Sequence, residues 1–230
     1  MHFSIVIATY QRSDDQSVNF LTRALNSIKN QTHQDFKLFL IGDKYEDNKE
    51  FESIATSILP EDKVYFENLP LAVEREKYTG FDLWCCGGVN AMNTGIQRSL
   101  DQGFEWVAHL DHDDYWSEDH LDSINNAIEL HPQSNFVYTC STHKGLGNIR
   151  PKKSSFDGQI HKIPAKACNV LHSSVCFNVK SLDLRYRDCL AETGKASPAD
   201  ADLWWRMSTY EKLYPLFIDK LTCFQPQQGA

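Results

Sequence analysis

The chain has 230 residues, of which 41% are hydrophobic, enough apolar material for one large core and too much for a disordered protein. Its formal net charge of −8 excludes general affinity for nucleic acid or for anionic membranes, because both attract basic surfaces. An anionic substrate would therefore need a local cation.

Strands and helices alternate in the N-terminal part of the chain. Residues 3–8 are a continuous apolar run typical of a buried strand, and residues 17–30 carry apolar side chains at helical spacing. A second buried strand is expected at 36–41, a helix at 51–59 and a short strand at 63–67. This alternation predicts βαβ units and a mostly parallel sheet.

The middle of the chain continues the pattern after an interruption. Residues 69–86 are less regular, and we expect them to wrap around a site. A helix is predicted at 89–100, a strand at 104–110, a helix at 121–130 and a strand at 135–141. Ligands of open α/β sheets bind at the carboxyl ends of the strands, so the end of 104–110 is a candidate site.

The alternation weakens in the last third of the chain. Residues 143–158 are rich in Gly, Lys, Pro and Ser and predict a long flexible excursion. Residues 170–179 are strand-like, and the polar segment 187–198 is expected to form a mobile lid. A helix within 200–214 and a closing strand at 216–224 complete the chain.

The cysteines and the N-terminus indicate a compartment. Seven cysteines are an odd number, no pair has the C-x-x-C spacing of a zinc site, and several lie in apolar runs. We interpret them as reduced thiols of a cytoplasmic protein. Residues 1–7 lack the charged and apolar regions of a signal peptide, and no apolar run approaches the ~18 residues of a membrane span. Peripheral membrane association through a partner stays open.

The most informative segment is Asp111-His112-Asp113-Asp114, which directly follows a predicted strand. Acidic side chains gathered at a strand end repel one another, and a divalent cation would relieve that repulsion. Oxygen ligands suit Mg²⁺ or Mn²⁺, ions that are often shared with substrate phosphates. In the alternative interpretation, Ser117 or Asp114 caps the next helix, which would explain one carboxylate but not Asp111 and Asp113. His109 and His112 could suggest zinc, but we expect them to pack around the site.

Six segments of the chain occur in an order and spacing that resemble the family 2 glycosyltransferases. They are SIVIATYQR at 4–12, NQTHQDF at 30–36, IGD at 41–43, GVNAMNTGI at 88–96, LDHDDYW at 110–116 and DADLW at 200–204. The resemblance implies the GT-A fold, an α/β architecture with a Rossmann-like, mostly parallel central sheet flanked by helices and a smaller acceptor-side subregion. It also implies an inverting transferase that uses a nucleotide-diphospho-sugar.

The resemblance assigns chemistry to three acids. Asp111 and Asp113 match the D-x-D motif that binds the metal and the nucleotide sugar, with Asp113 as the direct ligand of Mn²⁺ or Mg²⁺. Asp200 matches the general base, which removes the proton of the acceptor hydroxyl. The alternative for Asp200 is a cap of the helix that follows Pro198, and the two roles are compatible. Asp202, two residues on, is expected to make a structural hydrogen bond.

The resemblance also places four residues at the nucleotide sugar. Thr9 and Tyr10 would contact the nucleotide, with the Tyr10 ring against the base. Asp43 would accept a hydrogen bond from the base or ribose, and Asn93 would line the nucleotide-sugar pocket. Asp43 could instead be only a turn residue and Tyr10 only an aromatic at the edge of the core.

Four departures from the family pattern weaken particular contacts. The usual D-D-G-S is Gly42-Asp43-Lys44-Tyr45, so one acid remains, and Met92 replaces a common arginine. Ala199 stands where the family has a glutamate before the base. Gln225-Pro226-Gln227 replaces a C-terminal Arg-x-His, so a histidine metal ligand from the tail is not expected.

Other polar residues are interpreted conservatively. Arg75, Lys77 and Lys195 could reach a phosphate, but lone basic side chains are usually solvated. The segment His172-Ser173-Ser174 could face the acceptor.

These observations predict one GT-A domain over 1–230, with a nucleotide-sugar-binding half at about 1–113 and an acceptor-binding half at about 114–230. The predicted reaction moves a sugar from a nucleotide diphosphate, with UDP favoured, to a hydroxyl of a growing polysaccharide, a lipid-linked glycan or a protein-linked glycan. The donor sugar, the acceptor and the oligomeric state stay open.

The sequence disfavours three other classes of protein. A metal-dependent phosphohydrolase would use His109, His112 and Asp113, but such motifs lie on helices and this one follows a strand. A nucleotidyltransferase would show a glycine-rich basic loop after the first strand, which residues 8–11 lack. A non-catalytic nucleotide-sugar-binding module is disfavoured by the retained Asp111, Asp113 and Asp200.

Overall fold

The computed structural model describes residues 1–151 and 157–226, and within them ten strands form one sheet. Residues 152–156, which belong to the excursion predicted at 143–158, lie outside the described residues. The same holds for residues 227–230. The strands are β1 (Phe3–Thr9), β2 (Phe36–Gly42), β3 (Val64–Asn68), β4 (Trp106–His109), β5 (Tyr115–Trp116), β6 (Phe136–His143), β7 (Gly147–Ile149), β8 (Ile160–His161), β9 (Val175–Asn178) and β10 (Pro215–Phe224).

The helices lie between these strands, largely where apolar side chains recur at helical spacing. The longer ones are α1 (Ser17–Lys29), α2 (Asn48–Ile58), α5 (Val89–Asp101), α6 (His120–Leu130) and α9 (Ala199–Ser208). The shorter ones are α3 (Val73–Lys77), α4 (Gly80–Cys86), α7 (Val179–Leu182) and α8 (Cys189–Thr193), with 3₁₀ turns η1 (Glu61–Lys63) and η2 (His172–Ser174).

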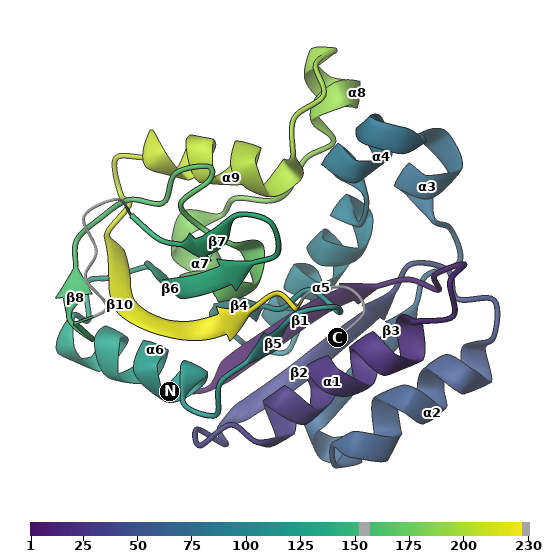
Figure 1. Ribbon diagram of the computed structural model, residues 1–230, viewed down its shortest axis with the longest axis horizontal. Helices are drawn as coiled ribbons and strands as arrows, with labels where there is room; N and C mark the ends of the chain where they lie inside the picture. The colour runs from purple at the N-terminus through teal and green to yellow at the C-terminus, as the bar shows by residue number, and fades with distance from the viewer. Residues whose placement is uncertain (152–156, 227–230) are drawn as a thin grey trace.

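The sheet has the order β3-β2-β1-β4-β9-β6-β10-β5. Its first four strands are parallel, as the βαβ alternation predicts. Strand β9 is antiparallel to both β4 and β6, while β10 runs parallel to β6 and curls strongly (Figure 1). The predicted α/β class is confirmed, and the parallel run β3-β2-β1-β4 is its Rossmann-like part.

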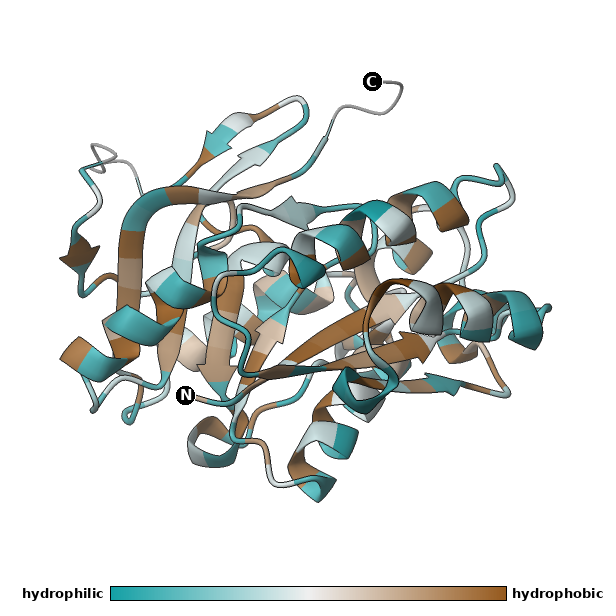
Figure 2. Cartoon of the chain, turned by 90° about the horizontal axis from the view of Figure 1, so that it is seen from below, coloured by the Kyte–Doolittle hydropathy of each residue, from teal (hydrophilic) through white to brown (hydrophobic). Residues whose placement is uncertain are grey.

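Helices cover both faces of the sheet and bury two apolar layers. One layer contains α1 and α2 with alternate residues of β1 and β2, such as Ile5 and Leu38, together with α6, which packs on β6 and β10. The other packs α5, α7 and α9 against the opposite side chains, such as Val6 and Phe39. Figure 2 shows the resulting pattern, with brown strands inside and teal on the outer turns of the helices.

One glycine sets the closeness of helix and sheet. A Cβ on Gly95 of α5 would lie 2.5 Å from Cγ1 of Val6 on β1, a distance that no side chain tolerates. The absence of a side chain therefore lets α5 lie directly on β1 and brings its N-terminal turn close to the carboxyl end of that strand.

Three expectations about irregular segments need revision. Residues 69–86 contain the helices α3 and α4, which periodicity cannot reveal because five and seven residues span two turns at most. The excursion at 143–158 begins with a hairpin, because β7 pairs with β6. The predicted strand at 170–179 starts with the 3₁₀ turn η2.

Candidate active site

A cavity of about 630 Å³ opens where the carboxyl ends of β1, β2 and β4 face the N-terminus of α9. Residues from both halves of the chain line it. Six of the residues singled out in the sequence lie in its wall, namely Thr9, Tyr10, Asp43, Asp111, Asp113 and Asp200. The tertiary structure therefore brings together side chains from opposite ends of the sequence, such as Thr9 and Asp200.

The acidic segment enters the cavity directly after β4. The backbone N–H of Asp111 donates a hydrogen bond to Oγ of Ser173 at 2.9 Å, and that hydroxyl donates to Asp114 at 2.5 Å. Both bonds tie the acidic loop to η2. Asp114 is completely buried, and burial together with the charges of Asp111 and Asp113 raises its pKa well above the usual range.

Asp114 and Ser117 do not cap the following helix. The residue before α6 is Asp119, and Oγ of Ser117 donates to its carboxylate at 2.6 Å. The helix-cap interpretation of the acidic segment is therefore wrong, because the chain first forms β5 before α6 begins.

His172 connects the acidic loop to the rest of the site. Its Nδ1 lies 2.7 Å from Oδ1 of Asp111, and its Nε2 lies 2.8 Å from the hydroxyl of Tyr186. Burial lowers the pKa of His172, but the charge and hydrogen bond of Asp111 and the charge of Asp200 outweigh it, so the pKa is raised. For Asp111 loss of hydration is outweighed by His172, and its pKa is lowered. The two side chains form an ion pair in which His172 donates.

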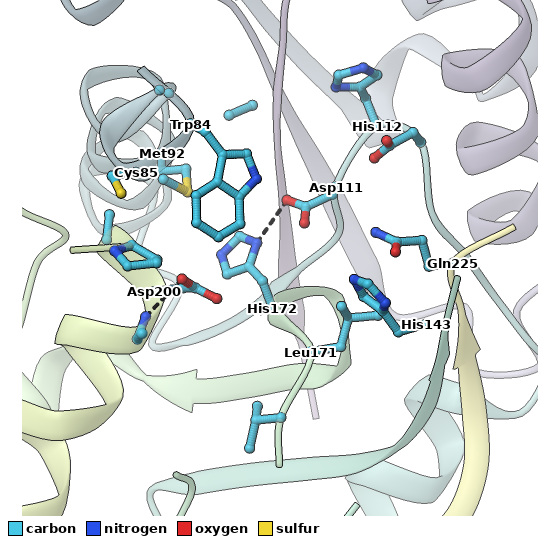
Figure 3. Close-up of a pocket in the computed structure, with 18 of the residues that line it drawn as sticks. Trp84, Cys85, Met92, Asp111, His112, His143, Leu171, His172, Asp200 and Gln225 are labelled. Atoms are coloured by element: carbon cyan, nitrogen blue, oxygen red, sulfur yellow. Dashed lines mark hydrogen bonds and ion pairs between the residues drawn. The ribbon is translucent and has the colours of Figure 1, made fainter. Parts of the chain in front are cut away.

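Asp200 lies in the first turn of α9 and faces the same cavity. Its Oδ1 accepts a hydrogen bond from the N–H of Ala201 at 2.7 Å, and Pro198 rather than Asp200 occupies the N-cap position. Loss of hydration raises the pKa of Asp200, and the nearby charge of His172 offsets this only in part. Figure 3 shows His172 between the carboxylates of Asp111 and Asp200.

The opposite end of the cavity is built around Asp43. Nε of Arg75 donates to Oδ2 of Asp43 at 3.0 Å, while Oδ1 is buried without a hydrogen-bond partner among the described residues. The guanidinium of Arg75 lies 3.3 Å from the centroid of the Tyr10 ring. Burial raises the pKa of Asp43 despite the charge of Arg75. An unpaired buried acceptor beside an aromatic ring is suited to a planar ligand that carries N–H donors.

Thr9 contributes less than its position suggests. Its hydroxyl is buried and lies 2.8 Å from the hydroxyl of Tyr45. Its carbonyl accepts the N–H of Asp43 at 2.7 Å, which holds the ends of β1 and β2 together. A nucleotide contact by the Thr9 side chain stays a prediction, and its hydroxyl is already engaged.

The side-chain amide of Asn93 is engaged by the backbone of Tyr186. Its Nδ2 donates to the carbonyl of Tyr186 at 2.8 Å, and its Oδ1 accepts the N–H of the same residue at 3.0 Å. Asn93 does not belong to the described cavity wall, in contrast to the expectation. The reason lies in the tertiary structure. Both polar atoms of the Asn93 amide bind the backbone of Tyr186, and the hydroxyl of Tyr186 contacts His172.

A curated relative decides the family. A glycosyltransferase of Acanthamoeba polyphaga mimivirus, described as uncharacterised, is 32% identical over 239 residues, covering 99% of this chain and 95% of that protein. The chain belongs to the glycosyltransferases. No protein-family model matches this glycosyltransferase.

Solved structures show the same architecture. Residues 1–349 of TarS from S. aureus in complex with UDP match with a TM-score of 0.67 at 18% identity, covering 97% of this glycosyltransferase and 60% of TarS 1–349. The same TarS region in complex with UDP-GlcNAc gives a TM-score of 0.67, also at 18% identity, covering 100% of this chain and 60% of that one. The mannosyltransferase PcManGT from Pyrobaculum calidifontis, in complex with GDP-Man and Mn²⁺, gives a TM-score of 0.64 at 14% identity. The match covers 99% of this chain and 58% of PcManGT. The glycosyltransferase therefore has the GT-A fold, and it spans about 60% of the length of these solved chains.

The family assignment removes the rival classes. The relative is a glycosyltransferase. It is not a phosphohydrolase, a nucleotidyltransferase or a non-catalytic module. His109 also argues against a hydrolase motif, because its ring is buried against Phe177, at 5.3 Å between centroids, and His172, at 4.9 Å.

The residues present fit a divalent cation. Among the described residues no donor lies against the carboxylate of Asp113, although it lines the cavity. Asp111 engages only Oδ1 with His172, so its other oxygen is available to a ligand. Two carboxylate groups that share a strand end and keep unengaged oxygens are the donor set that Mg²⁺ or Mn²⁺ prefers.

Asp202 is structural, as expected from its position two residues after Asp200. Arg187 donates to Oδ1 at 2.5 Å and Arg206 donates to Oδ2 at 2.7 Å. Asp202 is buried, which raises its pKa, but the two arginines outweigh the burial and lower it. The ion pairs fix α9, and with it Asp200, to the segment before α8.

Asp202→Asn is expected to lower the free energy of unfolding by about 2–4 kcal/mol, because two partly buried guanidinium groups lose their counter-charge. Since the folded pKa is lowered, this stabilisation is complete above the ordinary value of 3.8 and disappears as the pH falls through the folded value. Urea unfolding at about pH 7 and about pH 3 measures the difference.

The matched control is Asp183→Asn, since the carboxylate of Asp183 is exposed and lies 3.6 Å from Arg185. It should change the free energy of unfolding by less than about 0.5 kcal/mol. An equal loss for both variants, or a loss for Asp202→Asn that persists at low pH, would contradict the structural role.

Four residues make contacts at the site that their sequence context does not predict. Arg75 was interpreted as solvated, yet it joins Asp43 to Tyr10. Tyr186 and Trp84 belong to no recognisable motif, although Trp84 lines the cavity. His172 was noted only as a residue that could face the acceptor. Only the position of Arg75 in a segment expected to wrap the site could have suggested a role.

None of the seven cysteines, all within the described residues, is in a disulfide. No helix in the described part of the chain combines the length and the apolar character needed to cross a bilayer.

Proposed function

We propose that this glycosyltransferase is a metal-dependent, inverting member of family 2 that transfers a sugar from a nucleotide diphosphate, with UDP favoured, to a hydroxyl group. The acceptor class is a glycan, either a growing polysaccharide or a lipid-linked or protein-linked glycan. The observation that carries the proposal is one cavity with Asp111 and Asp113 at the end of β4 and Asp200 at the start of α9.

The reaction is a single displacement at the anomeric carbon. The carboxylate of Asp200 removes the proton of the acceptor hydroxyl as its oxygen bonds to the anomeric carbon. The bond between that carbon and the diphosphate oxygen breaks, and the nucleoside diphosphate leaves with the electron pair. Attack from the face opposite the leaving group inverts the configuration.

The other side chains prepare this step. Asp113 and Asp111 would hold Mg²⁺ or Mn²⁺, which when bound supplies the positive charge that neutralises the leaving diphosphate. His172 fixes the orientation of Asp111 through the 2.7 Å hydrogen bond. The raised pKa of Asp200 makes its carboxylate a stronger base than an exposed aspartate.

The donor end of the cavity supports a uracil nucleotide. Oδ1 of Asp43 is a buried acceptor without a partner among the described residues, and the N3–H of uracil could donate to it. Arg75 covers one face of Tyr10, so a base would use the remaining face or displace the guanidinium. The neighbouring structures contain UDP, UDP-GlcNAc and GDP-Man with Mn²⁺, which supports a nucleotide-sugar donor. Thr9 would position Asp43 by accepting its backbone N–H, and Asn93 would position Tyr186 by binding its backbone.

Donor binding and acceptor binding are assigned to different parts of the chain. We assign nucleotide-sugar binding to residues 1–113, which supply β1 to β4, and acceptor binding to residues 114–230, which supply α8 and α9. In this assignment residues 187–198 form a lid over the acceptor. The hydroxyl of Tyr78 donates to Asp188 at 2.9 Å and so connects this segment to α3.

Isothermal titration with UDP, GDP and dTDP, each with and without Mn²⁺, tests the proposal. We expect UDP to bind most tightly, and Mn²⁺ to increase its affinity about tenfold or more, because Asp111 and Asp113 would hold a cation whose charge offsets that of the diphosphate. Binding that is independent of Mn²⁺ for all three nucleotides would contradict metal dependence. No binding of any nucleotide would contradict the donor class.

A further inference from the structure

Two large aromatic side chains are exposed on the short helix α4. Phe81 is 65% exposed and Trp84 is 69% exposed. Their rings stack on each other with centroids 5.6 Å apart and planes inclined by 27°. A stacked aromatic pair that the fold leaves in water is a typical binding surface.

Trp84 of this pair lines the part of the cavity near Asp200 (Figure 3). Trp84 belongs to the cavity wall, as do its neighbour Cys85 and Asp200. Burial raises the pKa of Cys85, and the charge of Asp200 contributes to this, so α4 and the start of α9 are close in space. Figure 3 shows the indole pointing into the cavity, toward the side where Asp111, His172 and Asp200 meet.

We propose that Trp84, supported from behind by Phe81, is the stacking platform for a neutral pyranose ring of the acceptor glycan, so that one acceptor contact comes from the nucleotide-sugar-binding half. The inference rests on the proposed function, in which Asp200 touches the acceptor hydroxyl. An in-line displacement places the acceptor opposite the diphosphate, and a sugar held at Asp200 would lie beside Trp84. The C–H groups of a pyranose carry slight positive charge, which the negative face of an indole attracts.

The charges around the cavity specify a neutral sugar. Within the described cavity wall the arginines are Arg12 and Arg75, and no lysine is present. Both arginines are already paired, Arg12 with Asp14 and Arg75 with Asp43, and His172 is paired with Asp111. An acidic or phosphorylated acceptor at the Trp84 end would face Asp200 without a free cation, which Coulomb repulsion disfavours.

Kinetics with Trp84→Ala test the platform. The probes are methyl glycosides of glucose, galactose, mannose and N-acetylglucosamine, with methyl β-glucuronide as the acidic comparison and UDP-sugars as donors. We expect KM for the best neutral glycoside to rise about tenfold, the loss of one aromatic stacking contact. The rate of donor hydrolysis by water should be unchanged, and Trp84→Phe should restore most of the affinity.

Trp205→Ala is the matched control, since Trp205 is 63% exposed and lies outside the described cavity wall. A second measurement needs no transfer: in Trp205→Phe, a bound glycoside should protect Trp84 from quenching by acrylamide. An unchanged KM in Trp84→Ala, equal use of the glucuronide, or no protection by any glycoside would overturn the platform. If the wild type itself shows no metal-dependent binding of UDP, that result would instead contradict the proposed function.

Discussion

Asp200→Asn is expected to lower the rate of sugar transfer about a thousandfold, because an amide cannot accept the proton of the acceptor hydroxyl. The affinity for UDP with Mn²⁺ should stay within about twofold of the wild type, since Asp200 lies on α9, away from Asp43 and Arg75. The asparagine oxygen can still accept the N–H of Ala201, so the first turn of α9 is preserved. Transfer rates by mass spectrometry and UDP binding by calorimetry are the two measurements.

The pH profile gives an independent check on the same residue. The pKa of Asp200 is raised above 3.8 by loss of hydration, so its carboxylate accepts a proton at a higher pH than an exposed aspartate does. Transfer by the wild type should therefore decline as the pH falls through this raised value, and the residual rate of Asp200→Asn should lack that decline. Undiminished transfer by Asp200→Asn would remove Asp200 as the base.

Asp113→Asn is expected to reduce the affinity for UDP in the presence of Mn²⁺ about a hundredfold, the upper end of the losses seen when metal sites are disturbed. The expectation rests on the carboxylate of Asp113, which lines the cavity and interacts with Arg12 and His112 only through its charge. Without Mn²⁺ the variant and the wild type should bind UDP equally. Calorimetric titrations with and without the metal measure both quantities.

Thermal unfolding without metal separates a binding role from a structural one. Removal of a negative charge next to Asp111 and Asp114 relieves repulsion, so Asp113→Asn should unfold at the same temperature as the wild type or slightly higher. Asp62→Asn is the matched control, because Asp62 lies exposed in η1. Equal dependence on Mn²⁺ in Asp113→Asn and the wild type would show that Asp113 does not hold the metal.

Asp111 is a less selective probe of the metal than Asp113. Its carboxylate also pairs with His172, whose other nitrogen contacts Tyr186, and Asn93 holds the backbone of Tyr186. A substitution at Asp111 would therefore leave His172 without its counter-charge and disturb several contacts at once. This chain of contacts links Asn93 on α5 to Asp111 through Tyr186 and His172.

The sequence alone determined the fold class, the alternation of strands and helices and the position of the acidic segment at a strand end. These features are local, because the hydrophobic pattern of a buried strand or an amphipathic helix is formed by residues that are close along the chain. The short helices α3 and α4 were missed because they contain too few turns to show a period.

Only the tertiary structure decided which candidates share a site and what each side chain touches. It brought Asp200 to the cavity of Asp111 and Asp113, paired Arg75 with Asp43, and directed Asn93 to a backbone instead of a ligand. Such contacts join residues dozens of positions apart, and their geometry depends on how α5 and α9 pack on the sheet. A hydrogen bond requires its atoms to meet within about 3 Å, and spacing along the sequence carries no information at that scale.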